Sequence, residues 1–402
     1  MADIFNELFK HFKLDEIDID NWNFKLYSKV TVGIFMLVSA ASVATTYSGG
    51  AIECRSADFK EYSELFCWTH GSYHLPNALL EKQINRGERC FSPSRDQTSD
   101  EWNDDSEEDY EKSDTEYYLW VSLMLFVHGA LFMLPNQLWK YFEGGMMKQF
   151  KLEGTMKQSV EEAKDHAKRF DELSKKMTRK YFFTFLVCEY LNVIIAIVNY
   201  LIINSFLSGK FMSYGSDVLS YYIGTPYPEE ILGKSVETIN PMCNAFPTVV
   251  SCKTSFAGVS GIADKRNEIC ILGQNIINQK IYIILWWWFI ILFISSALMT
   301  ISRVVTIAVP NSRRAIIEAR MMTTKRVHVP AFPFSDIGHW FVLGQIGRNS
   351  NPYYFRELMR HLVTLKKSSK NDIESANENE PFIPYNERND KDGIELPQIN
   401  KA

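Results

Sequence analysis

The sequence predicts an all-α membrane protein: a four-transmembrane-helix bundle with two disulfide-linked extracellular loops and a helical cytoplasmic domain. Two observations support this fold class. Four apolar runs approach the length of roughly 20 residues that a bilayer-spanning helix needs. The segments between them alternate between acidic stretches that contain cysteines and a basic stretch that contains none. Mean hydropathy is slightly negative only because the charges gather between the apolar runs.

The clearest apolar run is the second, at 117–139. It opens with Tyr117, Tyr118 and Trp120 and closes with Trp139. Aromatic residues at both ends of an apolar core are typical of a bilayer-spanning helix, whose rings lie at the two membrane interfaces. We therefore predict a transmembrane helix with an aromatic belt at each end.

Residues 1–27 form an amphipathic segment without an early cleavable signal. We expect a short cytosolic helix there, at the membrane surface or at the mouth of a pore. The first span, 28–48, is short and contains the hydroxyl residues Ser39, Ser42 and Thr46. Small polar residues suit close helix packing or a wet surface better than lipid, so a bundle-packing helix and a pore-facing helix are both open.

The first large loop, 49–116, contains Cys54, Cys67 and Cys90, and it has 17 Asp/Glu against 7 Lys/Arg. Its second half, 96–116, is acidic enough to predict disorder. Three cysteines in one loop favour an oxidising compartment, so we place this loop outside the cell.

The next two segments are a cytosolic loop and the third span. Residues 140–180 hold 11 Lys/Arg against 7 Asp/Glu and no cysteine, which indicates a cytosolic, helical loop. The third span, 181–206, carries Glu189 and Asn192 on one face, and polar residues inside a membrane must face the bundle or water. Glu189 lies at a depth in the membrane similar to that of His128 in the second span, so the two could pair. The alternative is that backbone groups or water satisfy each side chain separately.

The second large loop, 207–279, contains Cys243, Cys252 and Cys270 and precedes the fourth span, 280–302. Three cysteines on each of two loops on the same side of the membrane predict cross-links between the loops. Each bridge would contribute a few kcal/mol at most.

The remaining chain is predicted to be cytosolic. Residues 303–365 begin with a run of arginines and lysines and contain two predicted helices, at 336–348 and 352–365. The tail, 366–402, is polar and predicted to be disordered. Both termini are therefore expected in the cytosol, and Cys188 of the third span is expected to be an unpaired core thiol.

Several classes of function are disfavoured. The net charge of −5 is too weak to suggest a nucleic-acid partner, and no phosphate-binding, dinucleotide-binding or metalloprotease motif is present. The intramembrane polar residues form no nucleophile–base or metal set, so we expect no enzyme activity, no cofactor and no metal site. His70 and His74 are read as ordinary loop histidines.

The second span opens with Tyr117-Tyr118-Leu119-Trp120-Val121 and continues with Pro135 and the run Trp139-Lys140 to Gly144. These motifs, together with others in the same order along the chain, resemble the innexins, the invertebrate gap-junction proteins. The resemblance covers about residues 20–365. Its signature lies at the second span, where the family has Tyr-Tyr-Gln-Trp-Val and this chain has Leu119 in place of glutamine. The other matching residues are Tyr117, Tyr118, Trp120, Val121, Pro135, the run Trp139-Lys140 to Gly144, Cys67-Trp68, Cys188-Glu189, Cys270-Ile271-Leu272, Trp286, Trp288 and Trp340-Phe341.

The resemblance implies a channel in the plasma membrane. Six or eight subunits, of one or several innexins, would form a hemichannel among membrane lipids. Two hemichannels of adjoining cells would dock through the extracellular loops and pass ions and small metabolites. The family pairs cysteines between the loops, which here implies Cys54 with Cys270 and Cys67 with Cys252. Its N-terminal segment and first span line the pore, so the candidate pore residues are Ala2, Asp3, Ser39, Ser42 and Thr46.

Three features depart from the family pattern. Cys90 and Cys243 are additional, and we expect a third bridge between the loops; two unlinked thiols are the alternative. The acidic segment 96–116 is an insertion that would attract cations, hinder docking or serve as a simple linker. His128 stands where many members have glutamine, and a pair with Glu189 would make gating sensitive to pH.

Two rival functions differ in class from the junctional channel. An unpaired hemichannel would conduct without docking. A tetraspan adhesion or scaffold protein would also have two disulfide-bonded loops and no pore. The chain lacks the Cys-Cys-Gly of tetraspanins and the tryptophan–cysteine pattern of claudins, which favours the channel.

Overall fold

The computed structural model describes most of the chain. Ala2, Asp3, Cys90, Tyr117 and most of the acidic stretch lie outside the described residues. The described residues are 17–47, 51–55, 60–70, 72–74, 113–114, 118, 120–150, 158–224, 229–231, 234–236, 240–257, 263–321 and 336–378.

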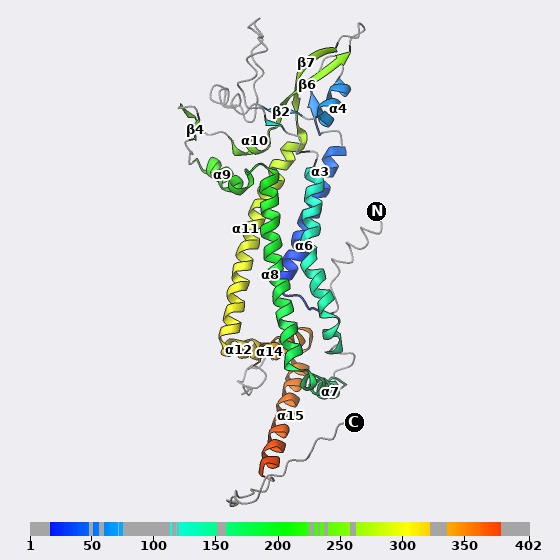
Figure 1. Cartoon of the computed structure of the whole chain (residues 1–402), viewed down its shortest axis with the longest axis vertical. Helices are drawn as coiled ribbons and strands as arrows, with labels where there is room; N and C mark the ends of the chain where they lie inside the picture. Colours follow the sequence, from blue (N-terminus) through cyan, green and yellow to red (C-terminus); the bar gives the residue numbers. More distant parts are fainter. Residues whose placement is uncertain are drawn as a thin grey trace, which may run out of the picture.

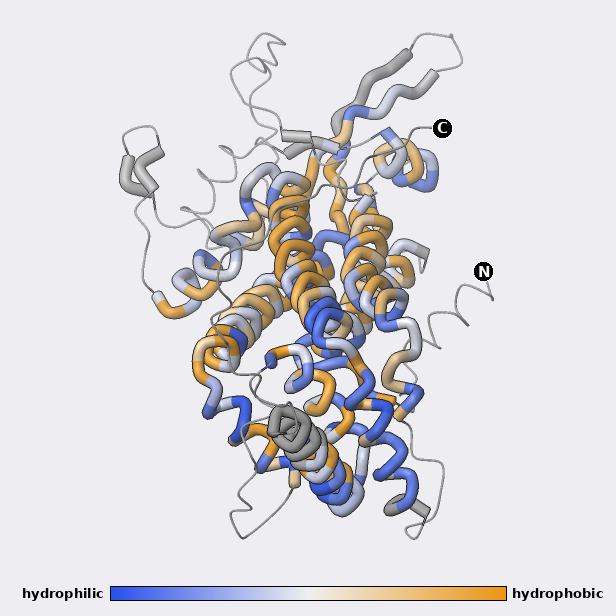
Figure 2. Tube along the Cα trace, turned by 60° about the horizontal axis from the view of Figure 1, so that its bottom comes forward, coloured by the Kyte–Doolittle hydropathy of each residue, from blue (hydrophilic) through white to orange (hydrophobic). Residues whose placement is uncertain are grey.

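Four long helices run side by side along the molecule (Figure 1). Each is long and apolar enough to cross a membrane, and together they confirm the four predicted spans. The first runs from Trp22 to Thr46. The others are α6 (Val121–Glu143), α8 (Lys175–Phe206) and α11 (Gly273–Ala308). Figure 2 shows hydrophobic residues along these helices and more hydrophilic ones among the helices at the end turned forward.

The first helix starts earlier than the predicted span, because Asn21 caps it. The Asn21 side-chain oxygen accepts a hydrogen bond from the Phe24 amide at 2.7 Å. The helix then passes through α2 (Trp22–Lys25), one π-helical segment η1 (Leu26–Thr31) and α3 (Val32–Tyr47).

Aromatic side chains from three helices fill the middle of the bundle. The Phe35 ring of α3 lies 5.6 Å from that of Phe132 in α6 and 6.3 Å from that of Phe289 in α11, centroid to centroid. Gly129 lets α3 approach α6, since a Cβ there would lie 3.1 Å from Phe35 Cβ. All three rings are fully buried, so this cluster forms the bundle core.

A five-stranded antiparallel sheet caps one end of the bundle, here called the sheet end. Its strand order is β1-β7-β6-β2-β3. The strands are β1 (Glu53–Cys54), β2 (Tyr73–His74), β3 (Ser113–Asp114), β6 (Val249–Ala257) and β7 (Ala263–Ile271). The same end holds α4 (Lys60–His70), α9 (Phe211–Ile223), α10 (Pro241–Ala245) and the hairpin of β4 (Glu229–Ile231) and β5 (Lys234–Val236).

The prediction of disorder in the acidic segment 96–116 is wrong at Ser113 and Asp114, which form strand β3. Ser113 and Asp114 pair with His74 and Tyr73 of β2. A strand ladder bonds main-chain groups, so polar side chains at these two positions do not prevent pairing. The rest of the stretch 96–112 lies outside the described residues.

The opposite end, here called the helical end, is built from further helices (Figure 1). They are η4 (Met146–Phe150), α7 (Gln158–Glu172), α12 (Pro310–Arg320), α14 (Ile337–Asn349) and α15 (Pro352–Glu378). The predicted helix at 336–348 is confirmed as α14, capped by Asp336. The prediction of disorder from 366 is wrong as far as Glu378, because no glycine or proline interrupts α15 and its residues include good helix formers.

Trp139 belongs to the core of the helical end. Its ring lies 4.9 Å from that of Phe185, and Phe185 lies 4.8 Å from Phe341 of α14. Trp139 is fully buried, so the predicted aromatic belt at this end of α6 is wrong: a ring that α8 and α14 cover cannot face a membrane interface. At the other end of α6, the two described belt residues differ: Tyr118 is buried, and Trp120 is exposed at 57%.

Gly338 lets α14 lie directly on the first turn of α8. A Cβ at Gly338 would lie 2.4 Å from the Arg179 amide nitrogen and 2.8 Å from the Thr178 carbonyl oxygen. Backbone cannot move aside cheaply, so Gly338→Ala is expected to destabilise the protein by about 1–3 kcal/mol, measured as a lower Tm. Gly344→Ala in the same helix is the matched control. Nothing lies within 4 Å of a Cβ there, and equal losses from both variants would contradict the packing argument.

Candidate functional site

Two disulfides join the loops of the sheet end. One links Cys54 of β1 to Cys270 of β7, at directly paired positions of the ladder. The other links Cys67 of α4 to Cys252 of β6. These are the pairs that the resemblance implied. All four cysteines are buried, so the bridges form the centre of this end rather than its surface.

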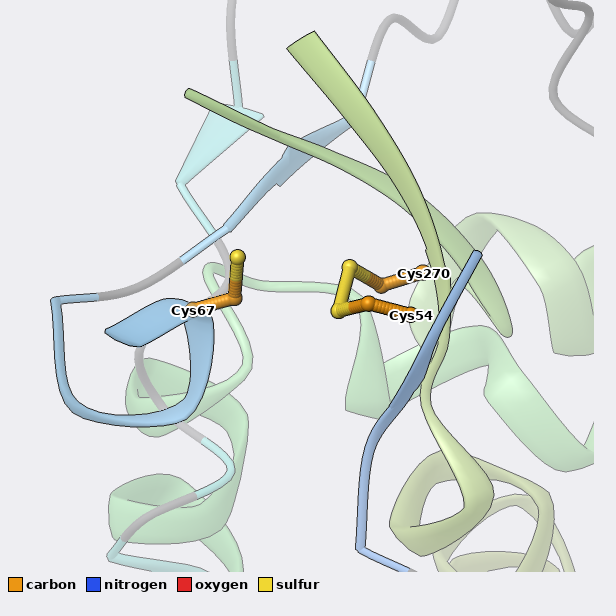
Figure 3. A group of neighbouring side chains, drawn as sticks. All are labelled: Cys54, Cys67 and Cys270. Atoms are coloured by element: carbon orange, nitrogen blue, oxygen red, sulfur yellow. A yellow bond between two sulfur atoms is a disulfide. The ribbon is translucent and has the colours of Figure 1, made fainter. Parts of the chain in front are cut away.

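The sulfurs of Cys54, Cys67 and Cys270 gather closely, as Figure 3 shows. Their Sγ atoms lie within 4.8 Å of one another, which is close enough for a metal site. Each sulfur is already bonded to another sulfur, however, and a metal needs the free thiolate. The group is therefore a covalent crosslink between the loops.

The remaining cysteines have different environments. Cys243 of α10 is disulfide-bonded. Cys90, its expected partner, lies outside the described residues. Cys188 of α8 is a free, buried thiol, as the sequence predicted.

Below the disulfides, a buried polar seam joins three membrane helices. Ser42 Oγ lies 2.8 Å from Ser122 Oγ of α6 and accepts a hydrogen bond of 2.7 Å from Gln274 Nε2 of α11. Ser39 Oγ donates to the Ser122 carbonyl oxygen at 2.9 Å. Thr46 Oγ1 donates to the Ser42 carbonyl oxygen at 3.0 Å and is half-buried.

The expectation that Ser39 and Ser42 line the pore is wrong, because both take part in this buried polar seam. Both are buried within one subunit, because the neighbouring helices supply the hydrogen bonds that water would supply in a pore. The bundle-packing alternative holds for these two residues. The exposed side of α3 instead presents apolar residues, with Leu37 exposed at 73%.

An ion pair lies inside the bundle near its helical end. Arg303 of α11 donates to both carboxylate oxygens of Glu189 in α8, from Nε at 2.7 Å and from Nη2 at 3.1 Å. The side chains are only 12% and 5% exposed. Asn21 Nδ2 donates to the same carboxylate. The ion pair therefore connects the starting cap of the first span to the third and fourth spans.

The predicted pair of His128 with Glu189 is wrong. His128 Nδ1 is hydrogen-bonded to the Asn199 side-chain oxygen, and Asn199 lies ten residues, about 15 Å, along α8 from Glu189. A buried carboxylate is better satisfied by the permanent two-donor charge of Arg303. Asn192 is fully buried, and its Nδ2 donates to the Cys188 carbonyl oxygen at 3.4 Å.

Residues 18–21, here called the N-terminal junction, are held by helix α14. Asn349 accepts a hydrogen bond from the Asp18 amide at 2.6 Å and donates to the Asp18 carbonyl oxygen at 2.9 Å. Arg348 donates to the Asp20 carbonyl oxygen. From the bundle, Asn136 Nδ2 donates to Asp20 Oδ2 at 2.8 Å. The chain is thus fixed to the helical end immediately before it enters the first span.

Asp336 anchors the start of α14 to α8. Its carboxylate accepts from Arg179 Nε at 2.5 Å and from His339 Nδ1 at 3.0 Å. Burial alone raises the pKa of Asp336, but the hydrogen bonds from His339 and Arg179 outweigh it and the net pKa shift is downward. Asp336 is therefore charged at neutral pH and keeps α14 in place under the N-terminal junction.

Sequence reasoning missed these partners because they lie far apart in the chain. Glu189 and Arg303 are separated by 114 positions and Asp18 and Asn349 by 331. One signal pointed to Arg303: it is the first basic residue after the fourth apolar run, where an intramembrane carboxylate could find a cation.

The innexin family model matches residues 20–365, which include all four membrane helices, both disulfides and the N-terminal junction from Asp20 onward. The chain belongs to the innexin family. It is 31% identical over 368 residues to Innexin inx2 of Drosophila melanogaster, covering 90% of this chain and 95% of that protein. It is 30% identical to Innexin inx2 of Schistocerca americana, covering 90% and 98%, and 30% identical to Innexin inx1 of Drosophila melanogaster, covering 92% and 99%.

Innexins are subunits of gap-junction channels and hemichannels, and this innexin has that function. Its signature at the second span has a structural role in the sheet end. The Tyr118 hydroxyl donates to the Cys67 carbonyl oxygen at 3.2 Å, and the Tyr118 ring lies 4.7 Å from that of Trp68. Val121 and Pro135 are buried in the bundle. The signature therefore joins the start of α6 to a disulfide-bonded loop.

Proposed function

We propose that this innexin forms a ring with other innexin subunits, of the same or another kind, and docks through its sheet end to the ring of an apposed cell. The observation that carries the proposal is the pair of buried inter-loop disulfides. They make one rigid unit of segments that are 216 and 185 residues apart. A surface that must meet another cell's channel in register needs this rigidity, because any residual freedom would be lost on docking.

In the proposed orientation the sheet end is extracellular and the helical end, with both termini, is cytosolic. The disulfides favour an oxidising compartment for the sheet end. The first turns of α8 at the helical end carry exposed basic residues, which the positive-inside rule places in the cytosol. These residues are Lys175, Lys176, Arg179 and Lys180. The disulfides and the basic residues thus favour the same orientation independently.

Residues 1–16 are proposed to line the pore mouth, with Ala2 and Asp3 among the pore residues. Support comes from the N-terminal junction, which fixes the point where this segment joins the first span. The exposed face of α3, with Leu37 and Val43, is proposed to meet the neighbouring subunit in the ring among membrane lipids. Thr46, half-buried near the outer end of α3, is retained as a pore candidate.

A third disulfide between Cys90 and Cys243 is proposed as an addition to the two described. Cys243 is bonded, and Cys90 is the one remaining cysteine of the seven that has no assigned state. Peptide mapping of unreduced protein is expected to recover a peptide that joins the two positions. Recovery of Cys90 as a free thiol would contradict the proposal.

Electrical recording from single and paired cells tests the channel function. Paired cells expressing this innexin are expected to couple, and each unpaired cell is expected to show at most a small dye uptake. Dye uptake without coupling would identify a non-junctional hemichannel. Surface delivery without conductance in either arrangement would support the rival adhesion or scaffold function and refute the channel.

A further inference from the structure

Helix α9 leaves the outer end of α8 through a tight turn that fixes its direction. Ser208 and Gly209 adopt positive φ angles of 52° and 83°, and the Gly209 amide donates to the Asn204 carbonyl oxygen at 2.8 Å. The Asn204 side chain then accepts from the Met212 amide at 2.9 Å. In Figure 1, α9 extends sideways from the bundle at the end of α8, across the direction of the long helices.

One side of α9 is packed tightly on the fourth span. A Cβ at Gly215 would lie 2.1 Å from Trp286 Cε3, so the helix rests directly on the indole ring. Trp286 Nε1 donates to the Met212 carbonyl oxygen at 3.1 Å, and the Tyr214 hydroxyl donates to the Gln279 carbonyl oxygen at 3.1 Å. The position of α9 relative to α11 is therefore set by packing and hydrogen bonds together.

A second side of α9 is apolar and uncovered. Met212, Leu219 and Ile223 are exposed at 54%, 44% and 68%. At about 100° per residue these three side chains fall within an arc of about 40° on the helix. Tyr222 is exposed beside this arc. The exposed and buried apolar arcs adjoin, so the packed side of α9 continues directly into the uncovered side.

The third side of α9 is polar and carries almost no charge. Ser213, Ser216, Asp217 and Ser220 lie about opposite the packed side, and their arc borders the apolar face. The helix contains no lysine or arginine. Lys210, just before it, donates to the Asn244 carbonyl oxygen at 2.8 Å. Burial of Lys210 lowers its pKa. That cation is thus engaged within the sheet end by neutral oxygens of Asn244.

We propose that α9 is an interfacial helix whose Met212–Leu219–Ile223 face inserts into the outer leaflet of the bilayer and takes neutral lipid as its partner. A helix across the bundle axis, at the level where a membrane helix ends, lies at the water–lipid boundary. The apolar face begins beside α8, where the Tyr200 hydroxyl donates to the Met212 carbonyl oxygen at 3.2 Å, and α8 itself exposes Leu201 at 51% near this end. A polar side toward water and an apolar side toward lipid is the pattern of such helices, and tyrosines favour that boundary.

The inference rests on the proposed orientation, which makes the leaflet around α9 the outer one. It adds a lipid contact to the extracellular loop that carries Cys243, Cys252 and Cys270. Because α9 packs on α11 and borders α10, the depth of this face in the leaflet fixes the height of the loops above the membrane. Bilayers that differ in thickness are therefore expected to present the docking surface at the same height above the outer leaflet.

Spin labels on α9 in phosphatidylcholine nanodiscs test the proposal. Leu219→Cys and Ser213→Cys each carry a label, about 120° apart on the same helix, and the unsubstituted protein, whose free Cys188 is buried, is the background control. The ratio of collision rates with oxygen, which dissolves in lipid, to those with a nickel chelate, which dissolves in water, is measured at each position. The ratio is expected to be severalfold higher at 219 than at 213.

Two outcomes would overturn the proposal. Equal access of the nickel chelate to both positions would place α9 in water. Exclusion of both reagents at 219 would show that a protein neighbour covers the face. Electrical coupling of the same variants is read separately, so a failed lipid contact in a conducting channel remains distinct from a failed channel function.

Discussion

Arg303→Met is expected to destabilise the subunit by about 3–5 kcal/mol, because it leaves the Glu189 carboxylate buried without a cation. Asn21 is the other side chain described on that carboxylate, and its amide cannot neutralise the charge. We expect a lower Tm for the purified protein in detergent and less protein at the cell surface. Coupling should fall with surface delivery.

The double variant Glu189→Met/Arg303→Met distinguishes pairing from side-chain size. Replacing both charges with apolar groups of similar volume removes the unpaired carboxylate, so most of the lost stability should return. A double variant as unstable as Arg303→Met alone would show that Arg303 acts through something other than this ion pair. Ser302→Met, at the exposed neighbouring position of α11, is the matched control and should leave Tm unchanged.

Cys67→Ser is expected to abolish electrical coupling between paired cells. Loss of the Cys67–Cys252 bridge, which spans 185 positions, should cost about 2–5 kcal/mol and release α4 from β6. The loops would then sample many arrangements, of which few present a surface able to dock. Cys188→Ala, which removes the free thiol, is the control and should keep coupling. Normal coupling in Cys67→Ser would show that docking does not require this disulfide.

Much of the fold could be predicted because a bilayer-spanning helix requires an apolar run that is visible within a short segment of the sequence. A spanning helix must be apolar over its whole length, so four runs identified four helices. The two disulfide pairs were predicted from the family resemblance, and α14 was predicted from the apolar pattern at 336–348. Each of these features depends on a short segment or on a known family pattern.

The remaining features depend on how distant segments meet. The first span is apolar nearly all round, so its sequence could not show whether Ser39 and Ser42 face a neighbouring helix or a pore. Trp139 is of the residue type, and at the end of an apolar run, that is typical of a membrane-interface belt. It is nevertheless buried in a core that includes residues of α8 and α14. The partner of Glu189 was misassigned because helix depths were counted from the ends of apolar runs, and α6 and α8 both extend beyond those ends.

The two disulfides also make the chain a closed covalent ring. Cys54–Cys270 and Cys67–Cys252 enclose everything between them, including all of α6 and α8. A single proteolytic nick between α6 and α8 on the helical side would separate the first two spans from the last two in sequence. The fragments would nevertheless migrate as one molecule until the disulfides were reduced. Cutting the backbone and disassembling the channel are therefore separate events in this protein.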